Sequence, residues 1–148
     1  MKFNDYLEKL ESLDVSKTFL KEDKIVFFIS GSSNLKTAAL GQERFEILNI
    51  FKQFGYKIIN SNFPYNEDFE FIILYPNFKA SLSNIVYYLG TLFNKKFKQE
   101  ILRHLEPVKH LKDVIVISLS SGLNIWNKFM DLTNYDNENI TMFALGPV

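Results

Sequence analysis

The pattern of hydrophobic and polar residues alternates between two periods along the chain. Apolar side chains at a helical spacing predict a short amphipathic helix over residues 3–12. Residues 25–29 form a continuous run of apolar, β-branched and aromatic side chains, which is typical of a strand buried on both faces. The helical pattern recurs and predicts a helix over 45–54 that Gly55 ends, a long helix from 81 to about 105 with a break near Asn94, and a helix from 122. The strand pattern recurs over residues 56–60, 114–118 and 141–145. Residues 69–75 fit either a strand or a hydrophobic loop.

Strands that alternate with helices predict the α/β class, here a three-layer α/β/α sandwich with a mostly parallel sheet. We see no repeat, linker or low-complexity segment, so we expect residues 1–148 to form one domain. Ligands of such sheets bind beyond the carboxyl ends of the strands. Two loops of small polar residues, 30–34 and 118–122, both follow predicted strands. We therefore expect these two loops to share one site.

Composition limits which partners and which cellular location we expect for this protein. Lys plus Arg and Asp plus Glu each number 17, so the formal net charge is zero and nothing indicates a nucleic-acid partner. The chain has no cysteine, which excludes disulfides, zinc–thiolate sites and a cysteine nucleophile. No apolar run approaches the roughly 18 residues of a membrane-spanning helix. The N-terminus lacks the apolar core of a signal peptide. We expect a cytoplasmic protein.

The segment 113–132, DVIVISLSSGLNIWNKFMDL, carries the candidate chemistry. Its apolar run leads through a short turn directly into a helical pattern, with Ser120 at the apex of the turn. The small residues two positions before and two after it, Ser118 and Gly122, have the spacing of a nucleophile elbow. Such a turn strains the backbone of Ser120, points its hydroxyl out of the strand end and turns the Ser121 N–H toward a developing oxyanion. Alternatively, Ser120 only caps the helix that follows.

Taken together, four segments in this order resemble the α/β-hydrolase fold from about Ile25 to Val148: ISGSS at 29–33, GYKIINSNFPY at 55–65, VIVISLSSG at 114–122 and ALGPV at 144–148. The resemblance rests on order and spacing more than on any single motif. It implies that Ser120 is the nucleophile of a serine hydrolase acting on a small ester or related acyl substrate, with no metal and no cofactor. It also implies oxyanion donors from Ser121 and from the loop Gly31, Ser32 and Ser33.

One departure from the family bears on activity. In the family an Asp or Glu and then a His follow the serine, but no histidine follows Ser120. His104 and His110 both precede it, and His110 falls at the amino end of the elbow strand, on the wrong side of the sheet. A serine hydroxyl without an adjacent base is a poor nucleophile. We therefore expect the 148-residue chain to be a poor hydrolase.

Two explanations stay open. Either the chain is the N-terminal part of a hydrolase whose acid and histidine lie beyond Val148, or it is a complete small α/β protein that shares only the architecture. The first explanation leaves the strand at 141–145 as an unpaired apolar edge. Such an edge predicts a homodimer or aggregation through it.

A non-catalytic function is the alternative to hydrolysis. The loop from Gly31 to Thr37 resembles a phosphate-binding loop, although Lys36 comes one residue too early and the second glycine is missing. A module that binds a small anion, a nucleotide or a partner protein through the loops 30–37 and 118–122 is therefore also consistent with the sequence. In the purely structural alternative, Asn34 or Thr37 caps the next helix.

Three further sets of residues have structural explanations. A metal site is suggested by four residues, of which the first two are four residues apart on a helix: Glu100, His104, Glu106 and His110. No third ligand has convincing spacing, and Pro107 separates the second pair, so a solvated helix end is favoured. The helical spacing of the aromatic residues between 82 and 97 favours core packing over an acyl pocket or an interface: Tyr87, Tyr88 and Phe93. Trp126 is predicted to pack against the sheet.

Overall fold

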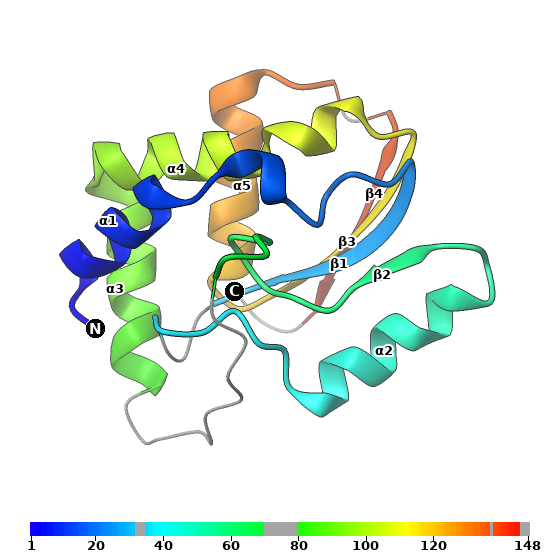
Figure 1. Ribbon diagram of the computed structural model, residues 1–148, viewed down its shortest axis with the longest axis horizontal. Helices are drawn as coiled ribbons and strands as arrows, with labels where there is room; N and C mark the ends of the chain where they lie inside the picture. Colours follow the sequence, from blue (N-terminus) through cyan, green and yellow to red (C-terminus); the bar gives the residue numbers. More distant parts are fainter. Residues whose placement is uncertain (32–34, 70–79, 137, 146–148) are drawn as a thin grey trace.

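The computed structural model describes residues 1–31, 35–69, 80–136 and 138–145 (Figure 1). The predicted element at 69–75 falls almost entirely outside these ranges. The helices and strands follow one another as α1 (Phe3–Ser12), β1 (Lys24–Ser30), α2 (Gln42–Lys52), β2 (Lys57–Ile59), α3 (Ala80–Phe93), α4 (Lys95–Leu105), β3 (Asp113–Leu119), α5 (Gly122–Thr133) and β4 (Ile140–Leu145). Two 3-10 helices, η1 (Val15–Lys17) and η2 (Glu106–His110), complete the set.

The four strands form one sheet in the order β2-β1-β3-β4, and every neighbouring pair is parallel. The α/β class is therefore confirmed. The central pair is the longest, because β1 and β3 stay in register from Lys24 and Asp113 to Ser30 and Leu119. β2 contributes only three partners to β1.

Helices lie on both faces of this sheet because successive side chains of β1 and β3 point to opposite sides. Phe27, Ile29 and Val116 belong to a buried cluster that includes residues of α1, α4 and α5. Val26, Phe28 and Ile117 form a second cluster with Leu48 of α2. Figure 1 shows the same division, with α2 on one side of the sheet and α1, α4 and α5 on the other.

The helix α5 packs on β1, as predicted for Trp126. Trp126 is only 2% exposed, and its ring centroid lies 6.2 Å from that of Phe27 on β1. The predicted break in the long helix is also confirmed. The Asn94 side chain accepts a hydrogen bond from the Phe97 backbone N–H at 2.9 Å and so caps α4, which separates it from α3.

The prediction of core packing for the aromatic residues of α3 is wrong where the structure describes them. Tyr88 is 44% exposed and Phe93 is 76% exposed. The physical reason is the position of α3, whose main packing partners are α4 and α5 rather than the sheet. Helical spacing indicates which residues share a face, but not whether another element covers that face.

The two edges of the sheet differ in length and in polarity. β2 is short and places the exposed, charged Lys57 at its start. β4 is six residues long and carries no charge, and four of its six residues are exposed. Phe143 is 45% exposed and Leu145 is 39% exposed. Among the described helices, none has the length and apolar character needed to cross a membrane.

Candidate active site

The two small-residue loops that were predicted to share a site are adjacent. Ser30, the last residue of β1, pairs in register with Leu119, the last residue of β3. The Gly31 backbone N–H donates to the Leu119 carbonyl at 3.4 Å. The turn after β3 therefore begins beside the loop after β1, at the carboxyl end of the sheet (Figure 1).

Ser120 forms the apex of the turn between β3 and α5. Its φ is 55°, in the left-handed region that residues other than Gly, Asn and Asp seldom occupy. The residue is exposed, and its hydroxyl makes no hydrogen bond within the described ranges. The helix-cap alternative for Ser120 is wrong, because the N-cap of α5 is Ser121, which itself makes no side-chain cap bond. A strained residue with a free hydroxyl is a candidate for function rather than for stability.

Gly122 explains how the turn fits against the sheet. A Cβ atom at this position would lie 2.0 Å from the Ile29 carbonyl oxygen and 2.6 Å from the Ser30 Cα. The first residue of α5 thus touches the backbone of β1, and only a glycine has room there. On β3, Ser118 is 1% exposed, and its Oγ is buried without a hydrogen-bond partner among the described residues.

The end of β1 is held by the loop that follows β2. The Asn62 side chain accepts from the Ser30 N–H and donates to the Ser30 carbonyl, both at 3.0 Å. It thereby continues the hydrogen-bond ladder after β2 has ended. The Tyr65 hydroxyl donates to the Phe28 carbonyl at 2.7 Å. The sequence showed a polar turn at this point, but nothing in it indicated that this turn clamps β1.

Arg44 of α2 also reaches the end of β1. Its Nη1 donates to the Ser30 hydroxyl at 2.7 Å, and Ser30 is fully buried. Burial lowers the pKa of the Arg44 guanidinium below its ordinary value. Nothing in the sequence pointed to this residue, since a single arginine in a helix carries no signal of its own.

The loop between β1 and α2 departs from the predicted geometry. α2 begins at Gln42 with Gly41 as its N-cap, so Thr37 does not cap a helix, and that alternative is wrong. The Thr37 hydroxyl instead accepts from the Ala39 N–H at 3.1 Å within the loop. Ser32, Ser33 and Asn34 lie outside the described residues.

Neither histidine serves Ser120 as a base. His104 is 3% exposed, and its Nε2 lies 3.3 Å from the Leu10 carbonyl oxygen and 3.5 Å from a Glu100 carboxylate oxygen. Burial, with a contribution from the neighbouring Arg103 charge, lowers the pKa of His104 to about 4. The predicted solvated helix end is therefore wrong, because α1 covers this face of α4. His110 is exposed at the amino end of β3, as predicted.

The acidic residues after Ser120 lie at the far end of α5. Asp131 pairs with Lys128 at 3.4 Å, and Asp136 and Glu138 are exposed between α5 and β4. No group of three potential metal ligands occurs within the described residues. Glu100 binds Arg103, which donates to the Leu10 and Leu13 carbonyls and so caps the end of α1. The described part of the chain thus places neither a base nor an acid beside Ser120.

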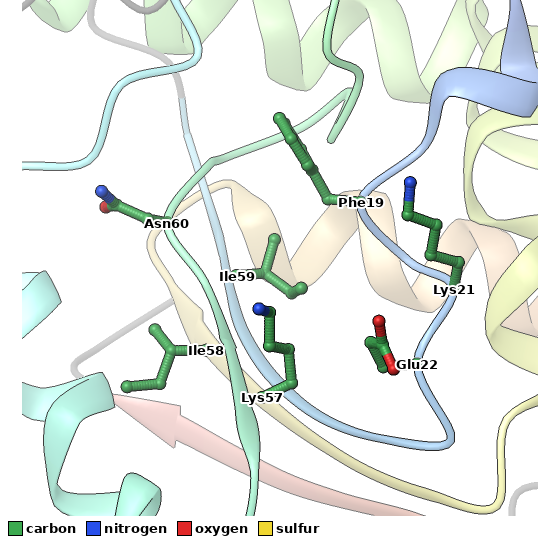
Figure 2. A pocket seen from close by; sticks show the side chains of 7 residues that line it. All are labelled: Phe19, Lys21, Glu22, Lys57, Ile58, Ile59 and Asn60. Atoms are coloured by element: carbon green, nitrogen blue, oxygen red, sulfur yellow. The ribbon is translucent and has the colours of Figure 1, made fainter.

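Two hollows lie away from Ser120, along the edge strand β2. One, of about 350 Å³, is lined by Phe19, Lys21, Glu22, Lys57, Ile58, Ile59 and Asn60. Figure 2 shows Lys57 and Ile59 on one side of the strand and Ile58 and Asn60 on the other. The second hollow, of about 360 Å³, opens toward α2 and shares Lys57, Ile58 and Asn60. We place the candidate chemistry at Ser120 because these hollows contain no comparable strained, unpartnered group.

The strain at Ser120 gives a testable prediction. We expect Ser120→Gly to raise the free energy of unfolding by up to about 1 kcal/mol, because glycine adopts positive φ without a steric penalty. Urea unfolding at neutral pH measures this. Ser121→Gly is the matched control, since Ser121 has a φ of −62° and should lose about 0.5–1 kcal/mol. A less stable Ser120→Gly variant would show that the backbone is not strained there.

Comparison with known proteins found no match for this chain among protein-family models, curated proteins or solved structures. Its function is therefore argued from the geometry of this site.

Proposed function

We propose that this chain carries the nucleophile of an α/β-hydrolase-type serine hydrolase that acts on a small ester or related acyl substrate. The observation that carries the proposal is the turn at Ser120, where a positive φ presents a free hydroxyl between β3 and α5. In a nucleophile elbow a small residue is needed where the helix approaches the neighbouring strand, and Gly122 approaches β1 in this way. The helices on both faces of the parallel sheet support the three-layer α/β/α sandwich as part of this proposal.

In the proposed reaction, the Ser120 oxygen attacks the substrate carbonyl carbon and the bond to the leaving alcohol breaks. A base takes the Ser120 proton and passes it to the leaving alcohol, and water then hydrolyses the acyl-enzyme. The Ser121 N–H is the proposed oxyanion donor on the elbow. The Gly31 N–H is directed at Leu119 O, so the second donor is proposed to come from Ser32 or Ser33. No metal or cofactor enters these steps.

This reaction requires a histidine that residues 1–148 do not place near Ser120. In the proposed reaction the histidine is supplied by further polypeptide, either of the same protein or of a partner. Without it we expect the 148-residue chain to hydrolyse esters no faster than its Ser120→Ala variant, because an unassisted serine hydroxyl is a poor nucleophile.

A fluorophosphonate probe tests the proposal. It is applied to the native product in its source cells and to the 148-residue chain, and the modified residue is mapped by mass spectrometry. We expect a native product heavier than the 17.3 kDa of this chain, labelled at Ser120, and no labelling of the isolated chain. A native product that stays unlabelled at Ser120, whatever its mass, overturns the hydrolase proposal.

The lack of a nearby base favours one alternative, a non-catalytic α/β module that binds a small anion, a nucleotide or a partner protein. Such a module would use the same loops at the carboxyl ends of β1 and β3. It predicts saturable binding without turnover that is unchanged in Ser120→Ala. The two proposals thus differ in whether the Ser120 hydroxyl is needed.

We also propose that the chain forms a homodimer through the β4 edge and that it is cytoplasmic. The uncharged β4 exposes Phe143 and Leu145, whereas the opposite edge is short and begins with Lys57. A long apolar edge without charge invites pairing with another strand. The absence of cysteine from this sequence fits that location.

The dimer proposal predicts a concentration-dependent mass in light scattering. We expect Phe143→Lys to shift the protein to monomer, because a charge on the paired strand would have to be buried in the dimer. Ile50→Lys on the exposed face of α2 is the control, since Ile50 is 55% exposed and lies outside β4, and should leave the mass unchanged. A clean monomer at every concentration would contradict the prediction.

A further inference from the structure

Arg44 is a partly buried cation that has no anionic partner among the described residues. The residue is half-buried, and its one hydrogen bond to a described residue is to the neutral hydroxyl of Ser30. No carboxylate lies within ion-pair distance of its guanidinium among the described residues. Removing a charge from water without a counter-ion costs free energy. Within the described residues, only the nearby charge of Glu43 acts against this penalty, and burial outweighs it.

The position of Arg44 in α2 adds to that penalty. Gln42 is the first residue of the helix, so Arg44 lies in its first turn, where the helix dipole disfavours a positive charge. The only acidic residue in this turn is Glu43, which is exposed and makes no ion pair with Arg44. Both the helix dipole and the partial burial thus disfavour a cation here.

Arg103 shows what a structural arginine looks like in the same fold. Its guanidinium is bound by the Glu100 carboxylate and by the Leu10 and Leu13 carbonyls. Each of the three guanidinium nitrogens of Arg103 donates to an oxygen that carries a negative charge or a partial negative charge. In the part of the chain that the structure describes, Arg44 has one acceptor, so most of its five N–H donors have no partner there.

We infer that Arg44 binds an oxyanion group, a carboxylate or a phosphate, of a ligand that occupies the carboxyl end of the sheet. Guanidinium groups bind both kinds of oxyanion through two parallel hydrogen bonds. Ser30 acts as a positioning residue, because its buried hydroxyl anchors one guanidinium nitrogen. Asn62 fixes Ser30 in turn through its two hydrogen bonds to the Ser30 backbone.

The anion site lies beside the candidate nucleophile. Ser30 pairs in register with Leu119, and Ser120 is the next residue along the chain. A small molecule bound to Arg44 can therefore also contact the end of β3. Naming the ligand as an acyl substrate with an anionic group rests on the proposed function, whereas the anion site itself does not.

Anion titration tests the inference. The probes are inorganic phosphate and acetate, each added to the 148-residue chain at constant ionic strength set with chloride, and binding is measured by calorimetry and by the shift in melting temperature. We expect saturable binding of at least one probe, weakened about tenfold or more in Arg44→Gln, since a charged hydrogen-bonding pair is lost. The arm that binds more tightly distinguishes phosphate from carboxylate recognition.

Control variants separate charge, geometry and catalysis. Lys52→Gln removes a positive charge from the last turn of the same helix and should leave binding unchanged. Arg44→Lys keeps the charge but not the planar fork, so its affinity should fall between those of the wild type and Arg44→Gln. Equal binding by Arg44→Gln, or no saturable binding of either probe by the wild type, overturns the inference. If Ser120→Ala still binds the anion while the native product resists the fluorophosphonate, the anion site stands and the hydrolase proposal falls.

Discussion

Gly122→Ala is expected to lower the free energy of unfolding by about 3 kcal/mol or more, which is a large fraction of the stability of a small domain. The new methyl group would lie 2.0 Å from the carbonyl oxygen and 2.4 Å from the carbonyl carbon of Ile29. These are backbone atoms of a central strand that is bonded to neighbours on both sides. Neither they nor the start of α5 can move without breaking the sheet or the turn at Ser120.

Urea unfolding followed by far-UV circular dichroism measures this loss. Gly41→Ala is the matched control, because a Cβ atom at Gly41 meets nothing within 4 Å. That variant should lose about 1 kcal/mol or less, through the poorer N-cap preference of alanine at the start of α2. Similar losses in the two variants would mean that α5 does not approach β1 as closely as described.

The sequence predicted the elements around this contact because their signals are local. A continuous apolar run marked β1 and β3, and small residues at fixed spacing marked the turn between β3 and α5. The signal for the break between α3 and α4 was equally local, because Asn94 itself caps α4. The exposure of Phe93 was not predictable, because it depends on which element covers α3. The same holds for Arg44 and Asn62, whose partner Ser30 is distant in sequence.

Acidification from pH 7 to pH 4.5 is expected to remove about 2–3 kcal/mol of stability through His104 alone. In the folded protein the pKa of His104 is lowered to about 4, mainly by burial, whereas an unfolded histidine titrates near 6.5. Between these values the unfolded state binds the extra proton and the folded state does not. The stabilisation is therefore complete above about pH 6.5 and is lost as the pH falls toward 4.

The groups around His104 account for the direction of this shift. Arg103 places a positive charge beside the ring, and Phe63 packs against it with 5.8 Å between ring centroids. The Leu10 carbonyl of α1 accepts a hydrogen bond from the ring and acts in the opposite direction, raising the pKa of His104, but it does not outweigh burial. Glu100 lies 3.5 Å from Nε2, but its carboxylate is already bound by Arg103 and offers little to a protonated histidine.

Urea unfolding of wild type and His104→Gln at pH 7 and pH 4.5 tests this prediction. The glutamine stays neutral, so the variant should lose about 2–3 kcal/mol less than the wild type between the two pH values. His110→Gln serves as the control, because His110 is exposed and should leave the difference unchanged. An equal loss in wild type and His104→Gln would show that His104 is protonated as easily in the folded state as in the unfolded state.

His104 also shows where a local pattern misleads. Its spacing from Glu100 is that of two ligands on one helix face, and its place near a helix end favoured solvent. Both residues are instead buried, because α1, ninety or more residues earlier, lies over that face. Burial of this pair follows from the packing of two distant helices and has no signal within α4.

The order of the strands has a consequence for how the protein is made. β1 has only three partners on β2, and its long neighbour β3 follows after more than half of the chain. During synthesis the strongly apolar β1 therefore stays uncovered on the side that faces β3 and α5 until those two elements have been made. Such high contact order predicts slow folding and a window in which nascent chains can aggregate. A chain cut before Asp113 is expected to remain unfolded, whereas one that reaches Thr133 contains every element that encloses β1.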